Sequence, residues 1–524
     1  MRGVVAAGHP LSAEAGARVL GEGGNAVDAA VAACLMSFAC ESPLTGPGAG
    51  GFMLVHTPAG EDVLLDFFVA SPGLGLAREA PAPAELVPIE VEFSAEATQV
   101  FNVGASSCGV PGTLAGLATA LARFGSVDLG ELCAPAAAAA REGIALRPMQ
   151  AYLHRILGPI LSSRDEGAAI YQPGGRPLGE GEVIRLPELG DLLERVGDEG
   201  PDFAYRGDVA RALSEWVLER GGLLTAEDLA AYRPLERRPA RTEYRGREVL
   251  TNPPPSSGGI LIALSLALLA GGRRSRDGRA LVEVTERANA ARTEDFMIGL
   301  NTEGFLERFL AREAVETTAG GTAQSPGSSS ASETAARGGR LGSTTHIAVL
   351  DADGGCASVT CSNGSGSGVV VPGTGIHLNN MLGEQDLNPL GFHRHPAGLR
   401  IPSMMAPTVV LRDGEPEVAL GSAGSNRIRS AVLQTLLGVV DDGLGAEEAV
   451  ARPRLHFEDG RVDAEPGVHP ETLRALEADG YAVRRWAERN LYFGGVQAVA
   501  RDPETGELSG GGDPRRGGSA VLAG

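Results

Sequence analysis

The chain has 524 residues, of which 43% are hydrophobic and 21% are charged, a composition typical of a globular protein that can build a sizeable core. The formal net charge is −21 and the sequence shows no stripe of basic residues, so we expect no nucleic-acid partner. The 45 basic residues are all arginine. The absence of lysine excludes Schiff-base chemistry, a pyridoxal-phosphate anchor, a P-loop lysine and a serine–lysine dyad.

The cysteine spacing and the hydropathy pattern exclude further classes. Six cysteines show neither a CxxC pair nor a histidine at zinc-binding spacing, and His393-Arg394-His395 has no third ligand nearby. We therefore expect buried thiols and neither a metal nor another cofactor. The N-terminal apolar stretch is too short for a signal peptide and no long apolar run follows, so we expect no membrane partner and a cytoplasmic location. The length leaves the number of domains open.

The first half of the chain is mainly helical in pattern. Residues 11–40 predict two alanine-rich helices, separated at Gly21-Glu22-Gly23-Gly24, with Asn25 as the N-cap of the second. Two short apolar runs, 52–56 and 63–67, predict a hairpin. Periodicity predicts four more helices, near residues 113–123, 128–142, 206–219 and 259–270.

The pattern changes in the second half. From Thr317 to Gly342 the composition is mostly Gly, Ser, Ala and Thr, and we expect a flexible segment because such residues bury little apolar surface. Two hairpins are expected after it, one from strands at 345–350 and 356–362, the other from strands at 408–411 and 417–420. A glycine-rich loop, residues 421–425, then leads into a helix at about 426–442.

The stretch Ser343-Thr344-Thr345-His346 closely resembles the processing site of the γ-glutamyltranspeptidase family. Further stretches match family motifs in family order across nearly the whole chain: Gly24-Asn25-Ala26-Val27-Asp28-Ala29-Ala30, Gly48-Ala49-Gly50-Gly51-Phe52, Val110-Pro111-Gly112-Thr113, Pro254-Pro255-Ser256-Ser257-Gly258-Gly259, Leu378-Asn379-Asn380 and Gly494-Gly495-Val496-Gln497. The resemblance implies an α+β fold, the four-layer αββα sandwich of the N-terminal nucleophile hydrolases.

The resemblance also implies that the chain is a precursor. Cleavage would give a large subunit, residues 1–343, and a small catalytic subunit, residues 344–524, which stay packed as one compact unit. Residues 317–343 would form the flexible processing segment. The predicted partners are therefore the two fragments of one precursor and a small-molecule amide substrate.

Thr344 is the predicted nucleophile. A threonine hydroxyl needs an adjacent base, and in this class the base is the residue's own α-amine, whose ordinary pKa is about 7.7 to 8.0. That amine exists only after the Ser343–Thr344 bond is cut. We expect the cut to proceed by attack of the Thr344 hydroxyl on the preceding carbonyl, so one side chain serves both self-processing and catalysis.

Matching to the family assigns further roles. Ser362 corresponds to a threonine that assists the nucleophile, and Glu384 to an acidic residue that holds the substrate's α-amine; alone, they would be interpreted as a strand-end serine and a solvated carboxylate. Gly424 and Ser425 lie where a strand passes into a helix, so their N–H groups predict an oxyanion hole. The family has glycine at position 425, and serine is tolerable there if its φ is negative.

Two departures from the family pattern concern the acyl group. A family arginine that grips the α-carboxylate follows an Asp-Phe pair, but here Phe68 follows, and a serine pair that binds the same carboxylate corresponds to Ser403-Met404. Phe68 and Met404 would disfavour a desolvated carboxylate by several kcal/mol unless another cation intervened. Cations that could intervene lie in the loop 383–400: His393, Arg394, His395 and Arg400. We favour a changed acyl specificity over this compensation.

Two other motifs do not indicate a site. Residues 46–51 match GxGxxG, but a helix precedes them and a strand follows, the reverse of the order in dinucleotide-binding folds. We interpret these glycines as a turn that allows close packing. We find no GxSxG nucleophile elbow, which disfavours an α/β-hydrolase.

The predicted function is that of a self-processing acyltransferase or amidohydrolase that forms an acyl-enzyme on Thr344. Its substrate would be a γ-glutamyl, glutathione-like donor or a related small amide. The alternatives are an acylase for non-glutamyl amides and an unprocessed, catalytically inactive relative that acts as a binding protein. The sequence leaves open the natural donor and acceptor, hydrolysis versus transfer, the extent of processing and the oligomeric state.

Overall fold

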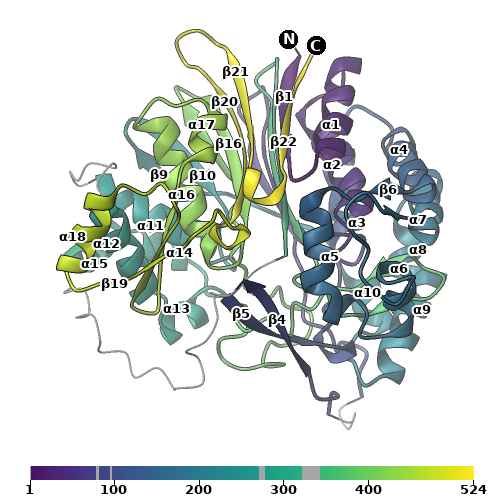
Figure 1. Cartoon of the computed structure of the whole chain (residues 1–524). Coiled ribbons are helices and arrows are strands. Elements are labelled where there is room, and N and C mark those ends of the chain that lie inside the picture. Colours follow the sequence, from purple (N-terminus) through teal and green to yellow (C-terminus); the bar gives the residue numbers. More distant parts are fainter. Residues whose placement is uncertain (1, 78–81, 95–96, 271–277, 321–342) are drawn as a thin grey trace.

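The computed structural model describes residues 2–77, 82–94, 97–270, 278–320 and 343–524. Two large β-sheets lie face to face, and helices cover the outer face of each sheet (Figure 1). The architecture is the predicted four-layer αββα sandwich.

The first sheet has seven strands in the order β22-β1-β11-β12-β2-β3-β8, and neighbouring strands are antiparallel. Their bounds are β1 Gly3–Ala7, β2 Gly50–His56, β3 Asp62–Phe67, β8 Leu235–Arg237, β11 Thr345–Asp351, β12 Cys356–Ser362 and β22 Ser519–Ala523. The second, antiparallel sheet has the order β21-β20-β16-β15-β10-β9. Its strands are β9 Ala240–Tyr244, β10 Arg247–Thr251, β15 Thr408–Arg412, β16 Glu415–Ala423, β20 Gly495–Arg501 and β21 Leu508–Gly512. Both sheets contain strands from before and after the Ser343–Thr344 bond.

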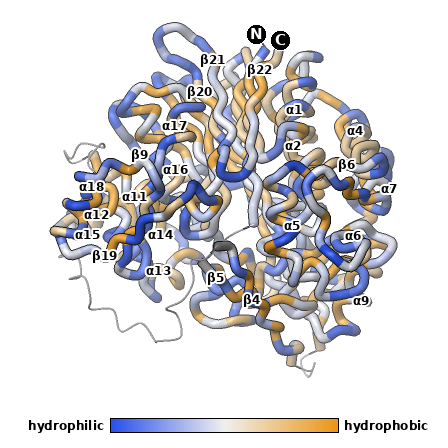
Figure 2. Tube along the Cα trace, in the orientation of Figure 1, coloured by the Kyte–Doolittle hydropathy of each residue, from blue (hydrophilic) through white to orange (hydrophobic). Residues whose placement is uncertain are grey.

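Side chains alternate between the two faces of each sheet, and both faces are buried. On β1, Val5 packs toward the helices and Val4 toward the second sheet; on β15, Val410 packs toward the helices and Val409 toward the first sheet. Figure 2 shows the central strands mostly in orange and white, and outer helices such as α7 largely in blue. Burial on both faces explains why these strands appear in the sequence as continuous apolar runs.

The helices divide between the two outer layers. Those on the side of the first sheet are α1 Pro10–Glu22, α2 Ala26–Cys40, α3 Thr113–Phe124, α4 Leu129–Glu142, α5 Pro148–Leu161, α6 Asp165–Tyr171, α7 Pro187–Glu199, α8 Asp202–Arg206, α9 Asp208–Glu219 and α10 Ala226–Ala231. Those on the side of the second sheet are α11 Gly258–Ala270, α12 Gly278–Ala290, α13 Glu294–Gly299, α14 Phe305–Phe309, α15 Arg312–Gly320, α16 Arg427–Val440, α17 Ala446–Ala451 and α18 Pro470–Ala478. None of the helices among the described residues is long and apolar enough to span a bilayer.

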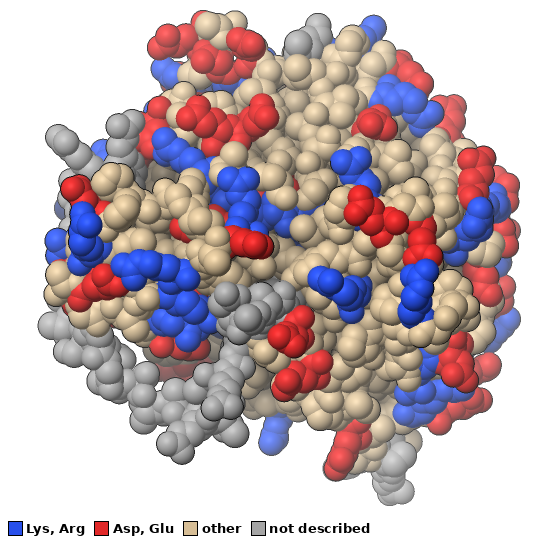
Figure 3. Space-filling view, viewed as in Figure 1, with Lys and Arg blue, Asp and Glu red and all other residues tan. Residues whose placement is uncertain are grey.

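Short strands complete the fold outside the two main sheets. They are β4 Val87–Ser94 with β5 Ala97–Val103, β6 Ile144–Ala145 with β7 Val183–Ile184, β13 Val370–Val371 with β14 Ile376–His377, and β17 Leu455–Glu458 with β18 Arg461–Ala464 and β19 Ala482–Arg485. On the face drawn in Figure 3, arginine and acidic side chains are interspersed rather than gathered into one basic surface.

Most predicted elements are present. Asn25 caps α2 through a reciprocal capping box with Asp28, and the three predicted hairpins are β2–β3, β11–β12 and β15–β16. All six cysteines are buried and free of disulfides. Strand β1 is an addition to the predicted elements, because its five residues are too few to give a periodic signal; it lies between β11 and β22.

The boundary of the predicted flexible segment needs correction. Residues 317–320 are helical, because Thr317 and Thr318 donate their hydroxyls to the carbonyls of Glu313 and Ala314 and so fit the last turns of α15. Ser343 is also buried, with 6% of its surface exposed. Residues 321–342 lie outside the described residues, so the predicted flexibility there stays a prediction.

Candidate active site

The nucleophile predicted from the sequence lies where β11 begins and β12 ends. Thr345 pairs with Cys361 in the antiparallel register, which brings Thr344 next to Ser362. The Thr344 hydroxyl donates to the Ser362 hydroxyl at 3.1 Å, and both residues are buried. Two residues that are 18 positions apart in the sequence are therefore held together by strand pairing.

Ser362 links the nucleophile to the peptide bond that would be cut. Its hydroxyl donates to the Ser343 carbonyl oxygen at 2.5 Å and accepts from the backbone N–H of Gly364 at 2.8 Å. The same oxygen accepts the hydrogen bond of Thr344. One hydroxyl thus contacts both the attacking side chain and the carbonyl that it would attack.

The predicted oxyanion loop connects β16 to α16. Neither the N–H of Gly424 nor that of Ser425 donates a hydrogen bond to another described residue, and both precede the positive end of the α16 dipole. Gly424 has φ +126° and Ser425 has φ +51°. The condition of a negative φ at Ser425 is therefore not met, and the positive φ explains why glycine suits this position.

Asp386 compensates for serine in this backbone conformation. A left-handed φ costs roughly 1–2 kcal/mol for a residue with a Cβ. The Ser425 hydroxyl donates a short hydrogen bond to the Asp386 carboxylate, and Arg292 donates to the Asp386 backbone carbonyl at 2.6 Å. The sequence analysis did not identify Asp386 as a site residue. Two features together could have indicated it: an acid two residues after Glu384, and serine at position 425, where the resemblance predicts glycine.

A small cavity of about 40 Å³ joins the predicted residues. It is lined by Phe68, Thr344, Ser362, Gly364, Met381, Glu384, Asp386, Leu387, Ser403, Met404, Met405, Ser425 and Ile428. We call this cavity the acyl pocket. Gly424 and Ser343 are next to lining residues in the sequence but do not line it themselves. The sequence analysis had not singled out Gly364, Met381, Asp386, Leu387, Met405 and Ile428.

The lining of the acyl pocket is apolar except for hydroxyls and acids. Phe68 is fully buried and stacks on Phe52 with ring centroids 5.2 Å apart. Glu384 accepts from the backbone N–H of Ser365 at 3.1 Å. The two ionisable lining residues, Glu384 and Asp386, are both acidic, and no arginine or histidine is among the described lining residues.

The cations proposed as a replacement clamp lie elsewhere. The Arg400 guanidinium contacts Asp66 at 3.3 Å, donates to the Arg233 carbonyl at 2.5 Å and stacks over the Tyr232 ring. The His393 ring contacts the Ser106 carbonyl at 2.8 Å. Because none of His393, Arg394, His395 and Arg400 lines the acyl pocket, this geometry favours a changed acyl specificity.

Two buried ionisable groups lie close to Thr344: His346 on β11, and Glu41, which contacts Thr345 at the start of β11. Burial lowers the pKa of His346 to about 3, so the imidazole stays neutral; it contacts the Thr360 hydroxyl at 2.8 Å. Burial raises the pKa of Glu41 to about 7, against the hydrogen bond from the Thr345 hydroxyl and the nearby Arg516. Neither group lines the acyl pocket. The sequence analysis did not identify Glu41, whose contact with Thr345 spans 304 positions.

The αββα fold and this site define a class. A buried threonine at the start of a central strand, a hydroxyl on the adjacent strand and a strand-to-helix turn with free N–H groups are the parts of an N-terminal threonine hydrolase. The model of the gamma-glutamyltranspeptidase family matches residues 12–523, and the chain belongs to that family. The family and enzyme class predicted from the sequence are therefore confirmed.

Similar proteins include acylases as well as glutathione hydrolases. The acylase ACY 1 proenzyme of Pseudomonas sp. strain SE83 is 33% identical, with 97% of this chain and 91% of that protein covered. The glutathione hydrolase proenzyme of Escherichia coli K12 is 31% identical, with 98% and 90% covered. A crystal structure of cephalosporin acylase from Bacillus halodurans superposes with a TM-score of 0.85 at 27% identity, over 99% of this chain and 95% of that one.

Proposed function

We propose that this chain is a self-processing acylase whose acyl group lacks the α-carboxylate of a γ-glutamyl substrate. It cleaves a small amide through an acyl-enzyme on Thr344. The observation that supports this choice is the lining of the acyl pocket, where both ionisable residues are acidic. Phe68 and Met404 also line it, at positions that the sequence resemblance assigns to the carboxylate-binding residues of the family. A carboxylate desolvated in these surroundings would lose several kcal/mol without a cation partner.

The contacts around Thr344 support the first step, self-processing. The Thr344 hydroxyl attacks the Ser343 carbonyl carbon, while the Ser362 hydroxyl holds both the attacking oxygen and the carbonyl oxygen. The bond from the carbonyl to the Thr344 nitrogen breaks, which leaves an ester that water hydrolyses. The products are a free carboxylate at Ser343 and a free α-amine on Thr344.

The freed amine then supports amide cleavage. It takes the proton of the Thr344 hydroxyl, which attacks the substrate carbonyl, and the N–H groups of Gly424 and Ser425 stabilise the oxyanion. The amine product leaves with a proton, and water or an amine accepts the acyl group. Glu384 lines the acyl pocket and, in this proposal, holds a protonated amine on the acyl chain.

The family name alone does not decide the acyl group. Its members include proteins named for glutathione hydrolysis and proteins named as acylases, at similar identity to this chain. A cephalosporin acylase is also among the similar structures. We therefore base the choice on the lining of the acyl pocket rather than on the relatives.

A matched set of anilides tests the proposal. The 4-aminobutyryl anilide is the γ-glutamyl anilide without its α-carboxylate, the glutaryl anilide lacks only the amine, and the butyryl anilide lacks both. We expect kcat/KM to be at least about tenfold higher for the 4-aminobutyryl than for the γ-glutamyl anilide, because removing the unpaired carboxylate recovers more than 1.4 kcal/mol. A preference for the γ-glutamyl anilide would contradict the proposal.

Processing is tested on the same preparation. An active enzyme gives fragments of 343 and 181 residues on a denaturing gel. A single full-length band without turnover of any anilide would favour the alternative of a catalytically inactive binding protein.

A further inference from the structure

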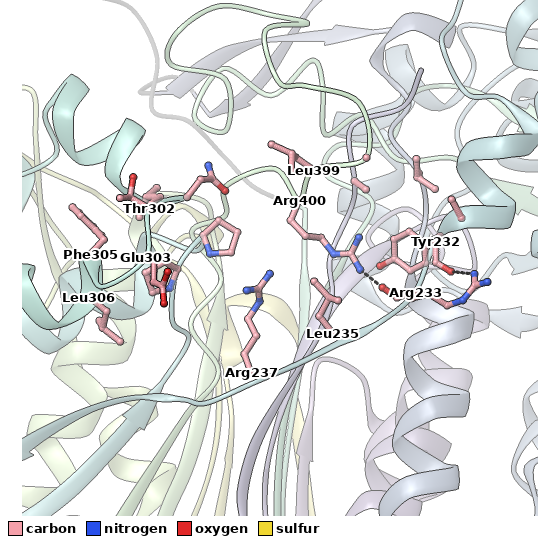
Figure 4. Close-up of a pocket in the computed structure, with 18 of the residues that line it drawn as sticks. Tyr232, Arg233, Leu235, Arg237, Thr302, Glu303, Phe305, Leu306, Leu399 and Arg400 are labelled. Atoms are coloured by element: carbon pink, nitrogen blue, oxygen red, sulfur yellow. Dashed lines mark hydrogen bonds between the residues drawn. The ribbon is translucent and has the colours of Figure 1, made fainter. Parts of the chain in front are cut away.

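A second cavity, of about 550 Å³, shares no lining residue with the acyl pocket. One wall comes from residues 231–237, which run from the end of α10 through β8. The facing wall comes from residues 300–307, which run from the α13–α14 loop into α14 (Figure 4). Leu399 and Arg400 lie between the two walls. We call this the arginine cavity, after Arg233, Arg237 and Arg400 in its lining.

The arginines of this cavity carry unbalanced positive charge. Arg237 and Arg400 share one fully buried carboxylate, that of Asp66, at 2.8 and 3.3 Å. Arg237 uses only its Nε in that contact, and its two terminal nitrogens have no partner among the described residues. Its side chain extends toward the space between the walls in Figure 4. A guanidinium presented in this way is suited to a two-point contact with a carboxylate.

The facing wall carries the opposite charge. Glu303, in the α13–α14 loop, and Glu307, on α14, line the cavity, and neither carboxylate has an ion-pair partner among the described residues. Asp228, the remaining acid of the lining, instead accepts the backbone N–H groups of Gly73 and Leu74. Apolar side chains also line the cavity: Leu74, Leu235, Pro254, Pro255, Leu306 and Leu399.

We propose that the arginine cavity binds a small molecule with a free carboxylate and a protonated amine, that is, an amino acid or a short peptide. The carboxylate lies on Arg237, the amine lies toward Glu303, and an apolar side chain fills the space between them. The volume is within the range of small-molecule sites. A simple anion would meet the two glutamates, and a simple cation would meet the arginines, so the lining selects a molecule that carries both charges.

The arginine cavity is connected to the acyl pocket through Phe68. Asp66, which the two arginines share, accepts the backbone N–H of Phe68 at 2.9 Å. Tyr232, which lines the arginine cavity, donates its hydroxyl to the Phe68 carbonyl at 2.7 Å. Groups in or beside the arginine cavity therefore hold both backbone groups of Phe68, whose ring lines the acyl pocket. The binding itself does not depend on the proposed acyl specificity.

Calorimetry with the full chain and L-leucine tests the proposal, with two analogues that each lack one charge. Leucinamide lacks the carboxylate and N-acetylleucine lacks the charged amine. We expect leucine to bind, and each analogue to bind at least about tenfold more weakly. The reason is that one hydrogen bond to a charged group contributes enough binding free energy to change the affinity about tenfold or more. No binding of leucine, or equal binding of leucinamide, would overturn the proposal.

Variants place the binding in this cavity rather than at Thr344. Arg237→Gln leaves Asp66 paired with Arg400 and should weaken leucine binding about tenfold or more; Glu303→Gln, on an exposed loop, should also weaken it. Arg238→Gln and Glu294→Gln are matched controls, because both residues are exposed and line neither cavity, and they should leave binding unchanged. Unchanged binding in both Arg237→Gln and Glu303→Gln would show that leucine binds elsewhere.

Discussion

The two ends of the catalytic site differ in how far they keep the family pattern. At the nucleophile end, the resemblance predicts that Thr344 and Gly424 keep the family pattern and that Ser362 stands where the family has threonine. The Ser362 hydroxyl contacts both the Thr344 hydroxyl and the Ser343 carbonyl. At the acyl end, Phe68 and Met404 line an apolar pocket, at positions where the resemblance predicts polar residues in the family.

The difference separates the chemistry from its specificity. Groups that make and break the bond must hold fixed distances, and strand pairing imposes those distances on Thr344 and Ser362. Groups that recognise the acyl chain need only match its charge and shape, so they can change without altering the bond-breaking step. The predictions below test where this division holds.

The largest loss, of both self-processing and turnover, is expected at the nucleophile end. Thr344→Ala removes the hydroxyl that cuts the chain and the hydroxyl that attacks substrate, so the protein should remain one band of 524 residues and show no turnover. Thr344→Ser is the control, because it keeps the hydroxyl and should yield both fragments. Mass spectrometry that finds the 343- and 181-residue fragments in Thr344→Ala would refute the assignment of the nucleophile.

The second-largest loss of activity is expected at Ser425 and Asp386, which line the acyl pocket beside the predicted oxyanion loop. Asp386→Ala removes the acceptor that offsets the left-handed conformation of Ser425, so we expect kcat to fall about 10- to 100-fold as the oxyanion loop loses its position. In a Ser425→Gly background, the same substitution should lower kcat less than about threefold, because glycine adopts this φ without strain. Equal losses in both backgrounds would mean that Asp386 acts on the substrate instead.

The sequence predicted the nucleophile end better than the acyl end for a physical reason. The processing motif consists of consecutive residues at the start of a strand, and the pairing of β11 with β12 follows from a local hairpin. The position of Arg400 depends instead on Asp66, which is 334 positions away, and the role of Asp386 depends on the φ of Ser425. Neither a distant ion pair nor a single backbone angle leaves a periodic signal in the sequence.

A smaller gain of activity is expected from Phe68→Arg. A guanidinium at this position would pair with the α-carboxylate of a γ-glutamyl anilide, so we expect its kcat/KM to rise about tenfold, with most of the change in KM. Phe68→Leu is the matched control, since it removes the stacking on Phe52 without adding a charge. If kcat/KM for the γ-glutamyl anilide does not rise above that of the control, the assigned role of position 68 is wrong.

The smallest effect on turnover is expected at Glu41, which accepts the hydroxyl of Thr345 at the start of β11. Burial raises its pKa from 4.5 to about 7, so the folded protein binds this proton more tightly than the unfolded chain does. That stability is fully present below about pH 4.5 and is lost as the pH rises through about 7. Gln at position 41 has no proton to lose, so the free energy of unfolding of Glu41→Gln relative to the natural chain should increase by about 2.5 kcal/mol between pH 5 and pH 8.

Urea unfolding of the processed proteins at the two pH values measures this difference. Glu14→Gln is the control, because Glu14 is an exposed carboxylate on α1 and its replacement should not change the pH dependence. We also expect Glu41→Gln to keep its turnover at pH 6, since Gln can still accept the hydrogen bond of Thr345. A pH-independent difference between Glu41→Gln and the natural chain would mean that the Glu41 side chain is ionised throughout. In that case, the chemistry at Thr344 would proceed beside a buried negative charge rather than beside a neutral acid.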